Sequence, residues 1–299
     1  MSLNSPPVFP PELEREMLEK AAHLHPETIF NLLLVSRRVY KWINGMQYRT
    51  VTPKGDRWSC PVHALQQAIQ SNTHPAGTFF HRNVRHVFID MATPTDHIPQ
   101  ILDACNGIQN LMIINPIPLG SIIPSIAALQ LRRLSLLWAA ILRNMNPSQP
   151  MFASLTHVHM WDLLSVSNDT TSRVPPSFLA QLPVLTHFAA LFRPTSRDFA
   201  VAARDILTTC KTLRVFMLNP LWETSLESLP LIDDVNFIYM DLGYRSVHLC
   251  DGWLAQTRGG IDFWARADAF VEKKRRGEIQ PTSRCWIQPA DGIPDFDSY

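Results

Sequence analysis

The apolar residues of this chain follow a short pattern, Leu-x-x-Leu-x-Leu, that recurs along most of its length. The clearest copy begins at Leu131, and the alternation in its second half is typical of a β-strand. In a strand, the fourth and sixth positions point to one face, and the third, fifth and seventh point to the other. The copies are 22 to 30 residues apart and begin at Val84, Ile108, Leu131, Leu155, Leu185, Leu213 and Val235. This spacing predicts a stack of repeated units, each with one strand.

Segments with helical spacing of apolar residues lie between these strands, at residues 61–70, 98–105, 122–129, 175–182 and 198–207. The alternation of strand and helix predicts an α/β fold with parallel strands. No Gly-x-Gly-x-x-Gly follows a strand, which argues against a dinucleotide-binding sheet. The repeat length is similar to that of leucine-rich repeats. We therefore expect residues 52–277 to form an irregular leucine-rich-repeat solenoid, with strands on the concave side and helices and loops outside.

A further amphipathic segment, residues 262–271, precedes the basic run at 273–276 and Gly277. An acidic start, a basic end and a following glycine suit the helix dipole and a helix stop. We expect this helix to close the solenoid as a cap, and the basic run to be its solvated last turn rather than a nuclear signal. Residues 278–299 contain three prolines and an acidic end, which predicts an extended tail.

Residues 9–51 have a different pattern, which predicts three short helices. Leu13, Met17, Leu18 and Ala21 form the first apolar stripe, and we expect it to be buried. The second stripe contains Ile29, Leu32, Leu33 and Val35, and the third contains Val39, Trp42 and Ile43 before Gly45. These stripes predict a small helical domain over residues 9–51.

This N-terminal segment resembles an F-box in four places: Phe9-Pro-Pro-Glu-Leu13, Leu34-Val-Ser-Arg-Arg-Val39, Trp42 and Tyr48-Arg-Thr-Val51. It is similar to the F-box-like proteins abundant in mushroom-forming fungi, which carry irregular leucine-rich repeats behind the box. The resemblance implies docking onto the Skp-type adaptor, and through it the cullin, of a cullin–RING ubiquitin ligase. It assigns adaptor binding to Pro10, Glu12, Leu13, Leu34, Val35 and Trp42. The alternative is a repeat-based interaction scaffold, in which this unit only caps the stack and engages no adaptor.

If the chain is a substrate receptor, the repeats hold an unknown protein substrate. Strand alternation places the third, fifth and seventh pattern positions on the concave face, where aromatic and basic side chains favour a protein interface. We expect substrate contacts from His86, Phe88, Arg133, His157, His159, Trp161, His187 and Tyr239, with Trp161 as the anchor. The alternative is that flanking loops or the C-terminal tail cover this face, which would place Trp161 in the core.

Composition narrows the classes of partner and compartment. Lys+Arg 27 against Asp+Glu 26 gives a net charge of +1, which disfavours nucleic acid and anionic membranes as partners. Five cysteines without a Cys-x-x-Cys pair favour reduced thiols, and the N-terminus does not have the pattern of a signal peptide. The uncharged stretch at 104–131 is interrupted by prolines, which disfavours a membrane span. We expect a cytoplasmic or nuclear protein.

The sequence contains no nucleophile elbow, phosphate-binding loop or His-Glu-x-x-His helix, so we expect no enzyme and no cofactor. Two weaker patterns contain residue types that could bind a metal or catalyse a reaction. His157, His159 and His187 share a face and could hold a metal, although a row of outward histidines without a carboxylate favours no metal. His248, Cys250 and Asp251 contain the residue types of a thiol catalyst, but ordinary packing explains them better.

Overall fold

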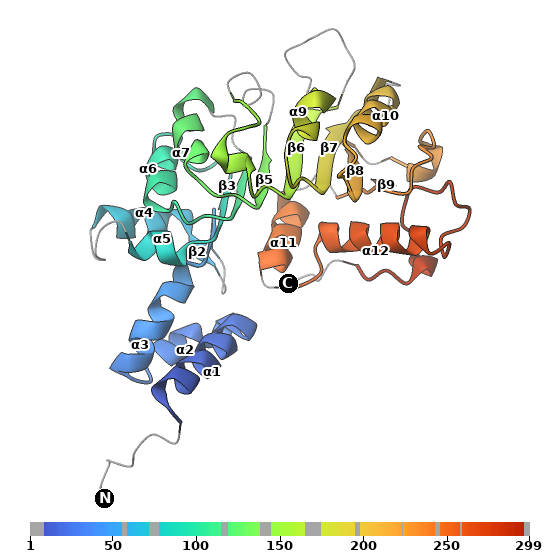
Figure 1. Cartoon of the computed structure of the whole chain (residues 1–299). Helices are drawn as coiled ribbons and strands as arrows, with labels where there is room; N and C mark the ends of the chain where they lie inside the picture. Colours follow the sequence, from blue (N-terminus) through green and yellow to red (C-terminus); the bar gives the residue numbers. More distant parts are fainter. Residues whose placement is uncertain are drawn as a thin grey trace, which may run out of the picture. The chain divides into compact units, whose positions relative to one another are not determined.

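Short parallel strands and the helices between them belong to two units of the chain, Met1–Ile108 and Gln109–Tyr299. The computed structural model describes residues 9–55, 59–71, 78–114, 119–137, 145–164, 175–194, 198–222, 224–242, 246–257 and 259–295. Every strand pairing within these two units is parallel, and the elements alternate as expected for an α/β fold (Figure 1).

The first unit begins with the three helices expected from the sequence: α1 (Pro11–Leu24), α2 (Ile29–Leu33) and α3 (Arg37–Ile43). A 3-10 turn at Asn44–Tyr48 then leads into β1 (Thr50–Thr52), which pairs with β2 (Cys60–Pro61) and β3 (His86–Ile89). The boundary expected between residues 51 and 52 therefore falls inside β1. Helices α4 (Val62–Gln70), α5 (Phe79–Asn83) and α6 (His97–Ala104) complete this unit, and α4 and α6 are at the segments with helical spacing.

Gly45 lies where the three-helix segment meets the rest of the first unit. A Cβ at this position would be 2.0 Å from Asn83 Oδ1, so any other residue would have to displace the Asn83 side chain. Next to it, the Tyr48 ring packs edge-on against Phe79 and Phe80, with centroids 5.8 and 5.5 Å away. The three-helix segment is therefore connected to the rest of the first unit by packing of Tyr48 against α5, and not only by the chain that follows it.

The described part of the second unit contains six strands in sequence order: β4 (Asn110–Ile113), β5 (Arg133–Leu136), β6 (His157–Leu163), β7 (His187–Phe192), β8 (Val215–Pro220) and β9 (Phe237–Tyr239). Helices α7 (Ile123–Ala127), α9 (Pro176–Ala180) and α10 (Asp198–Thr209) stand between successive strands, as expected. Two more helices follow β9, namely α11 (Ser246–Thr257) and α12 (Phe263–Arg275). Helices α9 and α10 lie on one face of the strands, and α11 and α12 lie on the other (Figure 1).

The register of the strands confirms the repeat pattern for five consecutive copies. Their fourth positions pair directly, as Leu111↔Leu134↔Val158↔Phe188↔Phe216. All five side chains are buried. They form the main core of the second unit, where the Phe188 and Phe216 rings stack with centroids 5.4 Å apart.

The last strand departs from the expected alignment. Phe216 pairs with Phe237, whereas a pattern starting at Val235 predicts pairing with Ile238. A shift of one residue exchanges the two faces of a strand. Tyr239 therefore lies on the core side, in register with Leu218, and packs against Phe192 with centroids 5.6 Å apart.

Residues 278–295, expected to be part of an extended tail, instead pack against the sheet and contain a short 3-10 helix at Pro289–Asp291. Ile279, Arg284 and Cys285 are buried, and the backbone N–H of Tyr239 donates to the carbonyl of Cys285. Because an uncovered edge strand can pair with another chain, this segment protects the backbone groups of β9.

Candidate functional site

The three-helix segment has a small core of its own. Ala22, Ile29, Val39 and Ile43 are buried there, with Leu18, Leu32, Leu33, Trp42 and Met46 packed around them. Ser36 starts α3 by accepting a hydrogen bond from the Val39 N–H at 3.2 Å, a normal N-cap. Arg38 pairs with Glu14 of α1 and lies over the Trp42 ring, 5.3 Å from its centroid. These contacts fix the turn between α2 and α3.

That turn presents apolar side chains to solvent. Leu34 is 86% exposed and Val35 is 64% exposed, directly before Ser36. Leu13 is 49% exposed, and Pro10 and Glu12 are exposed beside it in sequence. Five of the six residues that the F-box resemblance assigns to adaptor binding are therefore accessible, and the sixth, Trp42, is partly buried.

The prediction that the first apolar stripe is buried was wrong for part of α1. Leu13 and Met17 are exposed, and the core side of the helix carries Leu18 and Ala22. At about 100° per residue, Leu13 lies about 180° from Ala22 around the helix. Further exposed apolar side chains in the described part of residues 9–40 are Phe9, Leu24, Phe30 and Tyr40. These exposed apolar side chains make the three-helix segment a candidate for binding a protein partner.

The expected substrate face of the second unit is covered in part by α12. Asp262 accepts a hydrogen bond from Arg133 Nη1 at 2.9 Å, and Asp268 lies 3.1 Å from His187 Nε2. Trp264 packs edge-on against the rings of His157 and His187, with centroids 5.2 and 5.5 Å away. Helix α12 therefore covers this face. The sequence predicted it as a cap that closes the repeats, and the alternative considered there was a cover made by loops or the C-terminal tail, so neither prediction named this helix as the cover.

Four of the residues expected to contact a substrate are buried, so they cannot do so in this conformation: Phe88, His159, His187 and Tyr239. Tyr239 also donates its hydroxyl hydrogen to the Pro230 carbonyl at 2.8 Å. The other four, His86, Arg133, His157 and Trp161, are half-buried. Trp161 lies in a β-bulge of β6 and donates its indole N–H to Ser135 Oγ at 2.8 Å.

Histidines 157 and 187 stack face to face, with centroids 4.0 Å apart and ring planes 9° from parallel. Each ring has its Nδ1 atom 2.8 Å from the hydroxyl of the preceding threonine, Thr156 or Thr186. The in-plane lone pairs of stacked rings run side by side and do not converge on one point. Within the described ranges, no group of three His, Cys, Asp or Glu side chains has a geometry that could hold a metal ion.

Burial controls the protonation of this face. It lowers the pKa of His157 to about 2, with further lowering by His187 and Arg133, and it lowers the pKa of His159 to about 3. Both histidines are therefore neutral at neutral pH. The described cysteines, Cys60, Cys105, Cys210 and Cys285, are free thiols whose pKa burial raises. The side chains of His248, Cys250 and Asp251 lie outside the described residues.

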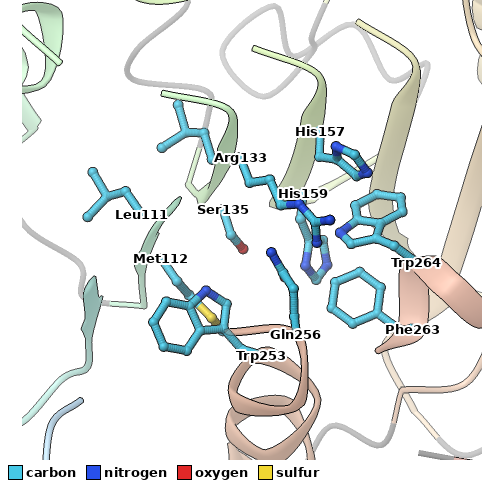
Figure 2. A pocket seen from close by; sticks show the side chains of 11 residues that line it. Leu111, Met112, Arg133, Ser135, His157, His159, Trp253, Gln256, Phe263 and Trp264 are labelled. Atoms are coloured by element: carbon cyan, nitrogen blue, oxygen red, sulfur yellow. The ribbon is translucent and has the colours of Figure 1, made fainter. Parts of the chain in front are cut away.

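A small cavity lies where β4, β5 and β6 meet α11 and the start of α12 (Figure 2). Its volume is about 20 Å³, enough for about one water molecule. Helix α11, which the sequence pattern did not predict, contributes Trp253 and Gln256 to the wall. The other lining residues are Leu111, Met112, Arg133, Leu134, Ser135, His157, His159, Phe263 and Trp264.

In comparisons with known proteins, no family model, curated protein or solved structure matches this chain. Among the described residues, no helix has both the length and the apolar character needed to cross a bilayer.

Proposed function

We propose that this chain is a non-enzymatic substrate receptor of a Skp–cullin–RING ubiquitin ligase, acting in the cytoplasm or nucleus. Its three-helix segment docks onto the adaptor. The second unit, with the preceding strands, belongs to an irregular leucine-rich-repeat solenoid that holds a protein substrate. The F-box-like motifs and the repeat period are independent features of the sequence, and both point to this class.

The exposure of Leu34 and Val35 is the observation that carries the proposal. Exposing two adjacent aliphatic side chains next to a helix N-cap is unfavourable in water unless a partner covers them. The turn is held by the Ser36 cap and the Arg38–Glu14 pair, so little conformational entropy is lost when a partner binds. The F-box resemblance assigns adaptor binding to these same two residues.

The test is the affinity of the purified full chain for a Skp-type adaptor. Changing Leu34→Asp together with Val35→Asp places two carboxylates on an apolar interface. This change should cost about 2 kcal/mol or more of binding, or about 30-fold in Kd. Because both side chains are exposed, thermal stability should stay unchanged. Leu231→Asp is the matched control, since Leu231 is an exposed leucine of the second unit, and it should leave the affinity as it is.

If the unmodified chain does not bind a Skp-type adaptor, the receptor function is wrong, and the scaffold function replaces it. Equal affinity for the double variant and the unmodified chain would move adaptor binding away from this turn.

A further inference from the structure

Two arginines of the first unit are neighbours at the starts of β1 and β3. The Arg49 carbonyl, directly before β1, accepts hydrogen bonds from the backbone N–H groups of Arg85 and His86, both at 3.0 Å. Burial and the nearby Arg85 charge lower the pKa of Arg49. Burial and the Arg49 charge likewise lower the pKa of His23, next to the end of α1. Arg49, Arg85 and His23 therefore form one group of side chains, the arginine cluster.

Backbone carbonyls hold the Arg85 guanidinium in a fixed orientation. Its Nη1 atom donates to the carbonyls of His81, Val84 and Gly107 at 2.8, 3.0 and 2.9 Å. Its Nε and Nη2 atoms lie on another edge of the guanidinium plane and have no hydrogen-bond partner among the described residues. An edge of this kind forms the fork that binds a carboxylate through two parallel hydrogen bonds. The Arg85 fork is therefore in place before a partner arrives.

No carboxylate of the described residues pairs with these two arginines. Arg49 is exposed, and its side chain makes no hydrogen bond or ion pair with any described residue. The glutamates of α1 that form ion pairs have other partners, Glu14 with Arg38 and Glu19 with Arg15. Two neighbouring like charges repel each other, and an anionic partner removes this cost. The arginine cluster is therefore suited to bind an anionic group.

The arrangement favours separate carboxylates over one phosphate group. A phosphate dianion is bound best where several donors converge on one point, such as a nest of backbone N–H groups. Here one fork is fixed on half-buried Arg85, and the second guanidinium belongs to the exposed and unpaired Arg49 side chain. The three carbonyl oxygens at Arg85 Nη1 also repel a dianion more strongly than a single carboxylate. An acidic peptide segment, whose carboxylates are spaced along a chain, fits these two positions.

The arginine cluster continues the exposed apolar surface of α1. Leu13, Met17 and Leu24 are exposed, and at about 100° per residue they lie within about 40° of one another around the helix. His23, also exposed, directly precedes Leu24 and lies about 15 Å along the helix from Leu13. A protein interface of standard size, about 800 Å² on each side, spans this distance. A partner on the apolar surface can therefore reach the cluster with its polar rim.

We propose that His23, Arg49 and Arg85 form a docking site for an acidic segment of a partner protein. One carboxylate binds to the Arg85 fork and a second binds to Arg49. That the partner is the Skp-type adaptor rests on the proposed function. The preference for carboxylates rests on the arginine cluster alone.

The first test is the association rate constant of the full chain with a Skp-type adaptor, measured by stopped flow at low and high salt. Charges at the rim of an interface act mainly on this rate constant. Arg49→Gln should lower it about threefold or more at about 50 mM NaCl, and screening should reduce the effect to less than about 1.5-fold at about 500 mM. Arg204→Gln, at an exposed arginine of the second unit, is the matched control and should have no effect.

The second test needs no adaptor. A fluorescent octaglutamate peptide should show a saturable rise in anisotropy when the full chain is added at low salt, and an octaglutamine peptide should not. Arg49→Gln should weaken octaglutamate binding about fivefold or more. Arg85→Lys keeps the charge but loses the fork, so it should weaken binding about threefold or more. Thermal unfolding of each variant shows whether the first unit stays folded.

No saturable octaglutamate binding, or equal binding by the unmodified chain and Arg49→Gln, would overturn the proposal. Tighter binding of a phosphoserine peptide of equal net charge would assign the cluster to phosphate instead. Equal adaptor association rate constants for the unmodified chain and Arg49→Gln at low salt would reject the adaptor as the acidic partner. A chain that binds octaglutamate through Arg49 but binds no adaptor would reject the proposed function and keep the carboxylate site, so the two proposals can fail separately.

Discussion

His157 and His159 make the stability of the second unit depend on pH. Their pKa values are about 2 and about 3 in the folded chain, against about 6.5 in the unfolded chain. As pH falls below about 6.5, the unfolded chain therefore takes up protons that the folded chain does not, and the free energy of unfolding decreases. At pH 5 the decrease should be about 2 kcal/mol for each histidine.

Urea denaturation at pH 7.5 and pH 5 measures this effect, and His159→Asn should reduce the difference between the two values. His81→Asn, at an exposed histidine, is the control and should leave the difference unchanged. An equal free energy of unfolding at both pH values in the unmodified chain would contradict the assigned protonation states.

Helix α12 depends on Asp262 in two separate ways. One oxygen caps the helix through the Ala265 N–H, and the other accepts from Arg133. Asp262→Ala removes both contacts and leaves Arg133 without its counter-charge, so it should cost about 2–4 kcal/mol of stability. Asp262→Asn keeps a capping oxygen and should cost about half as much.

Amide hydrogen exchange along residues 263–275 gives the local readout for both variants. Faster exchange in α12 for Asp262→Ala than for Asp262→Asn is the expected order. If the two variants exchange equally fast, the cap contributes nothing measurable and the Arg133 pair alone holds the start of the helix.

At the same scale, the repeat pattern correctly predicted the four registers between five consecutive strands, because the Leu-x-x-Leu-x-Leu spacing constrains which face of each strand is buried. It failed at β9, where Val235 and Ile238 fit the pattern but Phe237 and Tyr239 form the core. Every residue from Phe237 to Tyr239 is apolar, so the alternation that distinguishes two registers is missing. Helix α11 was missed because apolar residues occur on several of its sides rather than in one stripe.

The packing of α12 over the expected substrate face could not be predicted from the local sequence pattern. Arg133 and Asp262 are 129 residues apart, and His187 and Asp268 are 81 apart. The sequence predicted an amphipathic helix at 262–271 but not the surface against which it packs. The proposed adaptor surface differs in this respect, because the residues that the F-box resemblance assigns to it all lie within 9–42, so a short local motif is enough to make that prediction.

For the molecule as a whole, the proposed function separates two activities: adaptor binding by the three-helix segment of the first unit and substrate binding by the second unit. Substitutions that leave the second unit folded, such as Leu231→Asp, should therefore leave adaptor affinity unchanged. A change larger than about threefold in Kd, or about 0.6 kcal/mol, would mean that the two activities are coupled.

Hydrogen–deuterium exchange of the full chain, with and without a purified Skp-type adaptor, shows whether the α2–α3 turn binds the adaptor. We expect slower exchange on adaptor binding at residues 11–14 and 34–37, next to the exposed Leu13, Leu34 and Val35 side chains. Exchange in β5 to β7 and in α12 should not change. Protection confined to the second unit, or no protection at residues 34–37 under conditions where the adaptor is bound, would rule out adaptor binding through this turn.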